Sequence, residues 1–335
     1  MSSDYLCVTT KGMHFPIVTI TLNPAVDKST TVDTFVAEHK MRCAEPRYDA
    51  GGGGLNVSKA LKKLGSSSLA LFSSGGPTGA LLQELARQSG LDFRTVETAA
   101  WTRENFTVTE TTTNAQFRFN LPGPTLTDAE VSAWLAVLDT LPHPPGYVVV
   151  SGSLPQGVPA DFYARLARQV RNLGSRLILD TSGEPLRQAA NEGVFLLKPN
   201  LGELSNLAGV EKLEMTDVDD AARDIIHKGQ CEVVVVSLGP QGAMLVTRDF
   251  CEHVPAPPVK KLSTVGAGDS MVAGMTQALS QGKTFGDMVR LGVACGSAAT
   301  MNAGTQLFNT EDVNRLLHWL NQYGTKYRLP TDCTP

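Results

Sequence analysis

The sequence lacks the features that identify several large classes of protein. Its 335 residues carry a formal net charge of only −4, without a basic tract or an acidic tail, so no nucleic-acid-binding surface is indicated. The six cysteines lie far apart, at positions 7, 43, 231, 251, 295 and 333. This spacing favours free thiols over a zinc site or a disulfide framework.

Segments that direct a chain to a membrane are also lacking. Residues 1–16 are polar and mixed, without the charged start and apolar core of a signal peptide. No run approaches the roughly 20 apolar residues that a membrane-spanning helix needs. We therefore expect a cytoplasmic protein.

Several catalytic motifs are missing as well. The segment Gly282-Lys283-Thr284 ends like a P-loop but has Gln277 where the first glycine of that motif would stand. No GxGxxG follows the first expected strand, and neither a GxSxG elbow nor an HExxH helix occurs. The six histidines are isolated, so we interpret them as packed or surface residues.

What the sequence does contain is an alternation of apolar strands with helices. Strands are expected at 17–22, 68–72, 147–150, 176–179 and 232–237, with helices such as 161–173 and 217–228 between them. Near-continuous apolar strands indicate a parallel sheet that helices cover on both faces. We expect one α/β domain over residues 1–335, with a flexible tail at 324–335.

Two segments interrupt this alternation. Residues 29–48 alternate polar and apolar residues, and the runs 106–109 and 116–120 read as a hairpin. We expect them to form a small β-sheet lid of about residues 26–48 and 104–121. Its basic residues are either a ligand-facing set or an ordinary solvated face; they are Lys40, Arg42, Arg47, Arg103 and Arg118.

A run of four glycines, Gly51 to Gly54, opens a helix that ends at Gly65. Such a run lets the backbone lie directly against a ligand, and the Asn56 amide can bind sugar hydroxyls. A flexible loop is the alternative. Asp27, just past the first strand, is a second candidate for hydroxyl binding, with an Asx turn as its alternative.

A second glycine turn, within Lys261–Ser270, opens a helix whose apolar face carries Val272, Met275 and Leu279. Backbone N–H groups at such a start can bind a phosphate. Asp269 lies in the first turn and is a candidate base for an attacking hydroxyl. It could instead cap its own helix.

Polar residues also follow several of the expected parallel strands. Because the carboxyl ends of parallel strands share one edge of a sheet, we expect this set to lie together: Asp27, Ser153, Asp180, Asn200, Ser237 and Asp269.

The spaced motifs resemble those of the ribokinase-like (PfkB) family of carbohydrate kinases, from about Ile17 to Leu320. One is Gly52 to Asn56 with Ser58, Gly65 and Gly75, the second is Ser263 to Gly274, and the third is Asn200 to Glu203. Within the family the chain is most similar to PfkB-type 6-phosphofructokinases, at residues 101–105, 151–155, 198–200, 234–243 and 298–304. The resemblance implies a ribokinase-like three-layer sandwich with a mainly parallel sheet and a small β-sheet lid.

The resemblance also implies roles for individual residues. Asp269 would be the base, beside an anion hole of Gly266, Ala267 and Gly268. Sugar binding would involve Asp27, Gly52, Gly53 and Asn56, and the sugar's phosphate would contact Lys40, Arg42, Arg103 and Ser153. ATP would contact Lys198, Asn200, Ser237, Gly239, Gly242 and Thr264. Glu203 would help to position Mg²⁺, and K⁺ would lie among Ser263, Val265, Ala299, Asn302 and Gly304.

The implied reaction is ATP-dependent phosphorylation of a ketohexose phosphate, with fructose 6-phosphate giving fructose 1,6-bisphosphate. Tagatose-6-phosphate kinase and 1-phosphofructokinase are the close alternatives. A sugar-phosphate sensor is disfavoured by the intact Asp269, and a nucleoside kinase by the basic lid. The resemblance further implies a homodimer through the lid. Gln306 replaces an arginine of close relatives, which leaves the strength and selectivity of the K⁺ site open.

Overall fold

The computed structural model describes residues 16–302 and 306–324, and its largest element is a nine-stranded sheet in the order β13-β12-β11-β10-β9-β8-β1-β4-β5. Seven strands are parallel: β1 (Ile17–Thr21), β4 (Leu69–Ser74), β5 (Asp92–Glu97), β8 (Tyr147–Ser151), β9 (Arg176–Asp180), β10 (Val194–Leu197) and β11 (Cys231–Ser237). Two antiparallel strands, β12 (Ala243–Val246) and β13 (Cys251–Val254), extend one edge. The expected mainly parallel sheet is confirmed.

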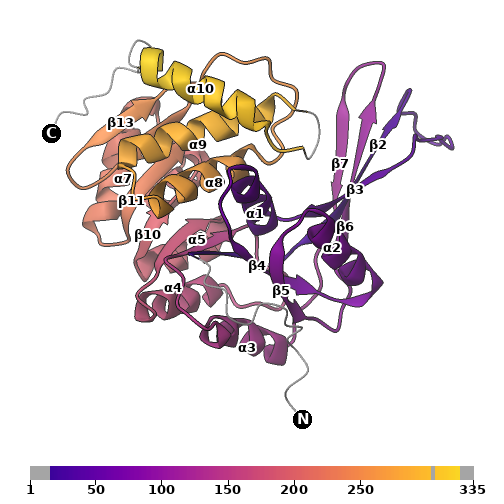
Figure 1. Cartoon of the computed structure of the whole chain (residues 1–335), viewed down its shortest axis with the longest axis horizontal. Coiled ribbons are helices and arrows are strands. Elements are labelled where there is room, and N and C mark those ends of the chain that lie inside the picture. Colours follow the sequence, from indigo (N-terminus) through magenta and orange to yellow (C-terminus); the bar gives the residue numbers. More distant parts are fainter. Residues whose placement is uncertain (1–15, 303–305, 325–335) are drawn as a thin grey trace.

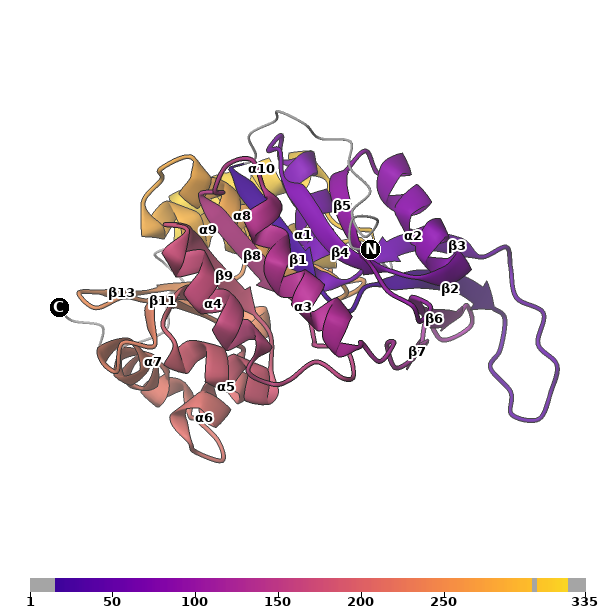
Figure 2. The ribbon, with the colours of Figure 1, turned by 90° about the horizontal axis from the view of Figure 1, so that it is seen from below.

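Helices cover both faces of this sheet (Figures 1 and 2). Val149 of β8 packs with one helix layer, whereas its neighbours Val148 and Val150 pack with the other, as side chains of a strand alternate between faces. The first layer contains α1 (Gly53–Lys63), α8 (Ala267–Ser280), α9 (Phe285–Thr300) and α10 (Thr310–Tyr323). The second contains α3 (Asp128–Ala136), α4 (Phe162–Asn172), α5 (Gly183–Asn191), α6 (Leu201–Ala208) and α7 (Val218–His227).

A separate four-stranded sheet stands out from this body, on the right of Figure 1. Its order is β3 (Arg47–Gly51), β2 (Ala25–Val32), β6 (Arg103–Glu110) and β7 (Gln116–Asn120). The predicted hairpin is present as the antiparallel pair β6–β7. The helix α2 (Gly76–Gln88) packs between the two sheets, where buried Leu82 meets a cluster that includes Val26 and Phe72.

The helix α3 ends at Ala136 and continues as a 3-10 turn, Val137–Thr140. Its start is fixed by a capping box between Thr127 and Glu130. Buried Trp134 anchors it to the sheet, because its Nε1 donates to Ser73 Oγ at 2.9 Å.

The expectation of free cysteine thiols is only partly confirmed. Cys43, Cys231 and Cys295 are free thiols, as expected, but Cys251 is disulfide-bonded. Cysteines that are distant in the sequence can meet in space, which spacing alone does not reveal. No helix in the part of the chain that the structure describes is long and apolar enough to cross a membrane.

The turn between β11 and β12 gives a test of the fold at the edge where the polar strand ends meet. We predict that Gly242→Ala lowers the free energy of unfolding by roughly 3 kcal/mol or more. Gly242 has φ 95°, and an added Cβ would lie 2.0 Å from the carbonyl oxygen of Val254.

Gly239→Ala is the matched control in the same turn. Gly239 has φ 59° with open space around it, so this variant loses only about 1 kcal/mol. Urea unfolding of both variants measures the difference, and equal losses would contradict the close packing of Gly242.

Candidate active site

Asp269 is held by two residues that are far from it in the sequence. Its Oδ1 accepts a hydrogen bond from Ser151 Oγ at 3.0 Å, and its Oδ2 accepts one from Asn56 Nδ2 at 2.9 Å. Gly266 precedes α8 with φ 71°, and no side chain caps the helix start. The interpretation of Asp269 as a cap of its own helix is therefore wrong, and the carboxylate faces the sheet edge instead.

The environment of Asp269 changes its acidity. Burial raises the pKa of this carboxyl from 3.8 to about 6, and the nearby charge of Asp180 adds to the increase. The hydrogen bonds from Asn56 and Ser151 act in the opposite direction, as does the charge of Lys198. A carboxylate with a raised pKa is a better proton acceptor near neutral pH.

A buried ion pair lies beside this carboxylate. Lys198 Nζ is 3.0 Å from Asp180 Oδ1, and the lysine side chain is only 7% exposed. Burial lowers the pKa of Lys198, but the charge and hydrogen bond of Asp180, with the charges of Glu203 and Asp269, together outweigh it, so the pKa is raised and the lysine stays charged. Lys198 Nζ would lie 3.6 Å from a Cβ placed on exposed Gly268, which puts a positive charge next to the start of α8.

The glycine run is explained by close packing of the chain against itself. A Cβ on Gly51 would lie 2.2 Å from the carboxylate of Asp27, and one on Gly53 would lie 2.2 Å from Ser151 Oγ. A Cβ on Gly54 would lie 2.5 Å from the carbonyl oxygen of Ile20, and Gly52 has φ 120°. These glycines therefore admit polar side chains of the site, a role that the sequence analysis did not foresee.

Asp27 lies within β2 rather than in an Asx turn, so that alternative is wrong. Its Oδ1 accepts a hydrogen bond from Asn105 Nδ2 at 2.8 Å. Burial raises the pKa of Asp27, while the charges of Lys59 and Arg103 lower it. Lys59 Nζ donates to the carbonyl oxygen of Ala50 at 2.5 Å, at the junction of β3 and the glycine run.

Arg103 and Ser153 come together at the end of β1. The Arg103 guanidinium donates to the backbone carbonyls of Asn23, at 3.0 Å, and Leu121, at 3.1 Å. Asn23 Nδ2 in turn donates to Ser153 Oγ at 3.2 Å. A guanidinium has five N–H donors, so donors are left for an anion beside Ser153.

The other two residues of the predicted phosphate set lie elsewhere. Lys40 and Arg42 are on the exposed loop between β2 and β3, and no described contact ties either side chain to Arg103. Their role in phosphate binding stays a prediction.

The predicted nucleotide-binding residues follow β10 and β11. Asn200 caps α6 in a reciprocal pair with Glu203, and Asn200 forms a parallel bridge with Ser237. Gly239 and Gly242 form the next turn, and exposed Thr264 lies before α8. These residues share the edge that contains Lys198.

For magnesium, Glu203 is the available carboxylate. Burial raises its pKa, and Asp180 adds to the effect. No group of three His, Cys, Asp or Glu residues is placed to hold a metal ion within 16–302 or 306–324. Magnesium here would need oxygens of the nucleotide phosphates and water in addition to Glu203.

The predicted K⁺ site brings two distant segments together. Ser263 N and Leu262 N both donate to the carbonyl oxygen of Thr300, at the end of α9. Val265 lies on the same loop, and Asn302 N donates to the carbonyl oxygen of Ala299. The carbonyl end of a helix favours a cation, so these residues fit one. Gly304 lies outside the described residues, and Gln306 is exposed.

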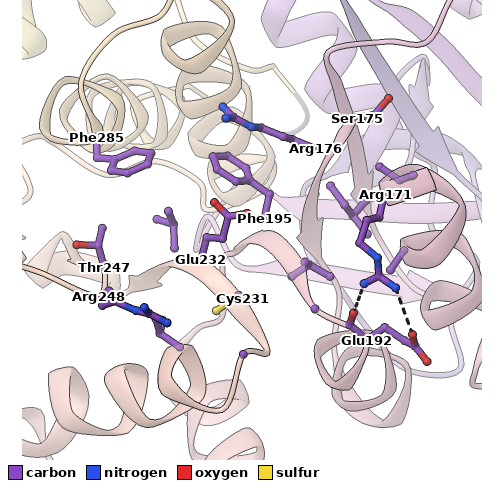
Figure 3. Close-up of a pocket in the computed structure, with 18 of the residues that line it drawn as sticks. Arg171, Ser175, Arg176, Glu192, Phe195, Cys231, Glu232, Thr247, Arg248 and Phe285 are labelled. Atoms are coloured by element: carbon purple, nitrogen blue, oxygen red, sulfur yellow. Dashed lines mark hydrogen bonds and ion pairs between the residues drawn. The ribbon is translucent and has the colours of Figure 1, made fainter. Parts of the chain in front are cut away.

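A cavity of about 590 Å³ lies at the opposite edge of the main sheet, where β9, β10 and β11 begin (Figure 3). Two of its arginines are engaged within the protein: Arg171 contacts Glu192, and Arg176 lies 4.8 Å from the ring centroid of Phe195. It contains none of the predicted site residues. The candidate site is therefore the carboxyl edge around Asp269, which gathers the predicted residues, and not this cavity.

Sequence reasoning missed four residues of this edge as site members. Ser151 and Asn105 lie in stretches that carry the family resemblance but were given no role, Lys59 was given none either, and Asp180 was expected at the edge only as a strand-end residue. Each contacts or faces Asp27 or Asp269. Two of these residues, Ser151 and Asp180, are neighbours because the register of β8 with β9 pairs them. A prediction of that register would have placed both at the site.

The sequence of this chain is similar to those of known phosphofructokinases. The chain is 48% identical over 299 residues to ATP-dependent 6-phosphofructokinase isozyme 2 of Mycobacterium tuberculosis, which covers 89% of this chain and 88% of the relative. It is 33% identical over 301 residues to 1-phosphofructokinase of Bacillus subtilis, over 90% of this chain and 97% of the relative.

Solved structures of known proteins are also similar to this chain. Phosphofructokinase-2 of Escherichia coli in complex with potassium matches with a TM-score of 0.89 and 41% identity, over 92% of this chain and 100% of that chain. Ribokinase of Arabidopsis thaliana, at 19% identity and a TM-score of 0.71 over 91% of this chain and 99% of that one, shares the fold. The expected ribokinase-like fold is confirmed.

The family follows from the length of the match. The model of the pfkB family of carbohydrate kinases matches residues 15–312. The matched region contains both glycine turns, the Asn200–Glu203 motif and Asp269. The chain belongs to the pfkB family of carbohydrate kinases.

Proposed function

We propose that the protein transfers the γ-phosphoryl group of ATP to fructose 6-phosphate and forms fructose 1,6-bisphosphate. The observation that carries the proposal is the half-buried Asp269 carboxylate, held by Asn56 and Ser151 at the start of α8, which no side chain caps. Relatives named 6-phosphofructokinase support this substrate, and one named 1-phosphofructokinase keeps that activity as the alternative. Tagatose 6-phosphate, an epimer, is a further alternative.

Asp269 accepts the proton of the attacking sugar hydroxyl. Its raised pKa of about 6 leaves it ionised at neutral pH but closer in acidity to the group that it deprotonates. The N–H groups of Gly266, Ala267 and Gly268, with Lys198 beside them, stabilise the negative charge of the phosphoryl oxygens. Mg²⁺, when bound with ATP, would neutralise further charge on those oxygens, and Glu203 would help to position it through water.

The sugar is bound on the other side of Asp269. Asp27 and Asn56 bind its hydroxyls along the backbone of Gly52 and Gly53. Its phosphate is bound by Arg103 and Ser153, with Lys40 and Arg42 from the exposed loop. A kinase for an unphosphorylated sugar would not need this basic set.

The nucleotide and a monovalent cation complete the site. ATP contacts Asn200, Ser237, Gly239, Gly242 and Thr264. K⁺ would be held near the end of α9, mostly by carbonyl oxygens, and the residues that would hold it are Ser263, Val265, Ala299, Asn302 and Gly304. The potassium complex of the Escherichia coli relative supports a cation here.

The small sheet serves as a lid and as the contact of a homodimer. It stands away from the main body and exposes large apolar side chains: Tyr48 is 38%, Phe119 45% and Leu121 51% exposed. Apolar groups on a projecting sheet are typical of a subunit contact. We place the protein in the cytoplasm, where ATP and sugar phosphates are available.

Turnover with sugar phosphates tests the proposed reaction. With a panel of sugar phosphates and ATP, ADP release is expected with the highest kcat/KM for fructose 6-phosphate. Asp269→Asn should lower kcat by roughly 10²- to 10⁴-fold and leave ATP binding nearly unchanged. The exposed Asp220 of α7 supplies the control, since Asp220→Asn should keep full activity. If no sugar phosphate is turned over, the protein is not this kinase.

The same variant is expected to gain stability at higher pH. The folded-state pKa of Asp269, about 6, lies above its ordinary value of 3.8. The stability that its protonated form contributes is therefore present below pH 4 and is lost as pH rises through 6. Asn cannot ionise, so the advantage of Asp269→Asn over the wild type should grow by up to about 3 kcal/mol across this window.

Urea unfolding between pH 4.5 and 7.5 measures this difference, and Asp220→Asn is again the control. If the difference in stability between Asp269→Asn and the wild type did not change with pH, the pKa of Asp269 would not be raised in the folded protein.

Arg103→Ala should raise the KM for fructose 6-phosphate by about tenfold or more, because a bidentate contact to the phosphate is lost. The KM for ATP should change little. Arg118→Ala, an exposed arginine of β7, is the matched control and should leave both constants unchanged. An unchanged KM for the sugar phosphate in Arg103→Ala would remove Arg103 from phosphate binding.

A further inference from the structure

The hydroxyl of Ser151 lies between two carboxylates, those of Asp269 and Asp180. Ser151 is the last residue of β8, and the parallel register pairs it with Asp180, the last residue of β9. Its Oγ is 3.0 Å from Asp269 Oδ1 and 3.4 Å from Asp180 Oδ2. A serine hydroxyl has one proton, so it can donate to only one of these carboxylates at a time.

The hydroxyl of Ser151 is closely surrounded by other atoms of the protein. Ser151 is 3% exposed, and a Cβ on Gly53 would lie 2.2 Å from its Oγ. The hydroxyl therefore occupies the position that a side chain at residue 53 would take. The glycine run and the serine at the end of β8 form one arrangement that brings a donor to Asp269.

Charged groups face Asp269 from several elements. Asp180 is the last residue of β9, Lys198 directly follows β10, and Lys59 lies in α1. Asp180 repels the ionised base, while Lys198 is held by Asp180 Oδ1 at 3.0 Å. Ser151 is the neutral donor between the two negative charges.

We propose that Ser151 is a positioning residue that exchanges its hydrogen bond between Asp269 and Asp180 as the base changes its protonation state. The inference rests on the proposed function, in which Asp269 is the base. Before transfer, the Ser151 hydroxyl donates to ionised Asp269 and orients it.

During transfer, the O–H bond of the sugar hydroxyl breaks and an O–H bond forms on Asp269. The protonated carboxyl can then donate to Ser151 Oγ, while the serine proton turns to Asp180 Oδ2. No proton leaves Ser151. The Asp180–Lys198 pair thereby receives the hydrogen bond that Asp269 no longer needs.

The test is Ser151→Ala, which removes the hydroxyl with little change of volume. Loss of a hydrogen bond to a charged group should move the acid midpoint of the kcat/KM profile upward by about one pH unit. The activity lost at pH 6 should be several-fold larger than that lost at pH 8.5. Ser151→Cys keeps a weaker donor and should give an intermediate shift.

Ser175→Ala is the matched control, because Ser175 is also buried and donates to a backbone carbonyl, that of Pro145, at the opposite edge of the sheet. It should lower stability and leave the pH profile in place. A Ser151→Ala profile parallel to that of the wild type would overturn the inference and leave the proposed kinase standing.

A readout that needs no turnover separates the two claims. Carboxyl NMR of ¹³C-aspartate-labelled protein, with Asp269→Asn to identify the signal, should show the Asp269 titration moved to higher pH in Ser151→Ala. An unmoved titration overturns the hydrogen-bond role of Ser151. A moved titration in a protein that phosphorylates no sugar supports the hydrogen bond but overturns its place in catalysis.

Discussion

The site depends on one half-buried negative charge, the carboxylate of Asp269 at the carboxyl edge of the main sheet. A charge removed from water must be compensated, and here Asn56 and Ser151 donate one hydrogen bond each to its two oxygens. The compensation is incomplete, because burial and Asp180 still raise its pKa to about 6. The structure thus keeps a destabilised carboxylate at the point where a proton acceptor is useful.

The same constraint explains the positions of the glycines. Gly53 admits the hydroxyl of Ser151, and Gly51 admits the carboxylate of Asp27. The chain thereby brings α1, β2, β8 and α8 into contact around two carboxylates. The small sheet and the main sheet meet at this same junction, where Asp27 of β2 lies against Gly51.

Sequence reasoning predicted the parts of this site that local patterns mark. The glycine turn before Asp269, the strand-end residues and the mainly parallel sheet all have short-range signals. The partners of Asp269 could not be found this way, since Asn56 is 213 residues from it and Ser151 is 118 residues from it. The glycine run was interpreted as space for a ligand, because sequence alone cannot show that the chain's own side chains occupy that space.

The most direct test of this account is a crystal structure with fructose 6-phosphate and a non-hydrolysable ATP analogue. The account predicts that the attacking hydroxyl of the sugar lies within hydrogen-bond distance of the Asp269 carboxylate, with the terminal phosphate at the start of α8. It would be contradicted if the sugar hydroxyl lay beyond the reach of Asp269 or if the terminal phosphate were bound away from Gly266–Gly268.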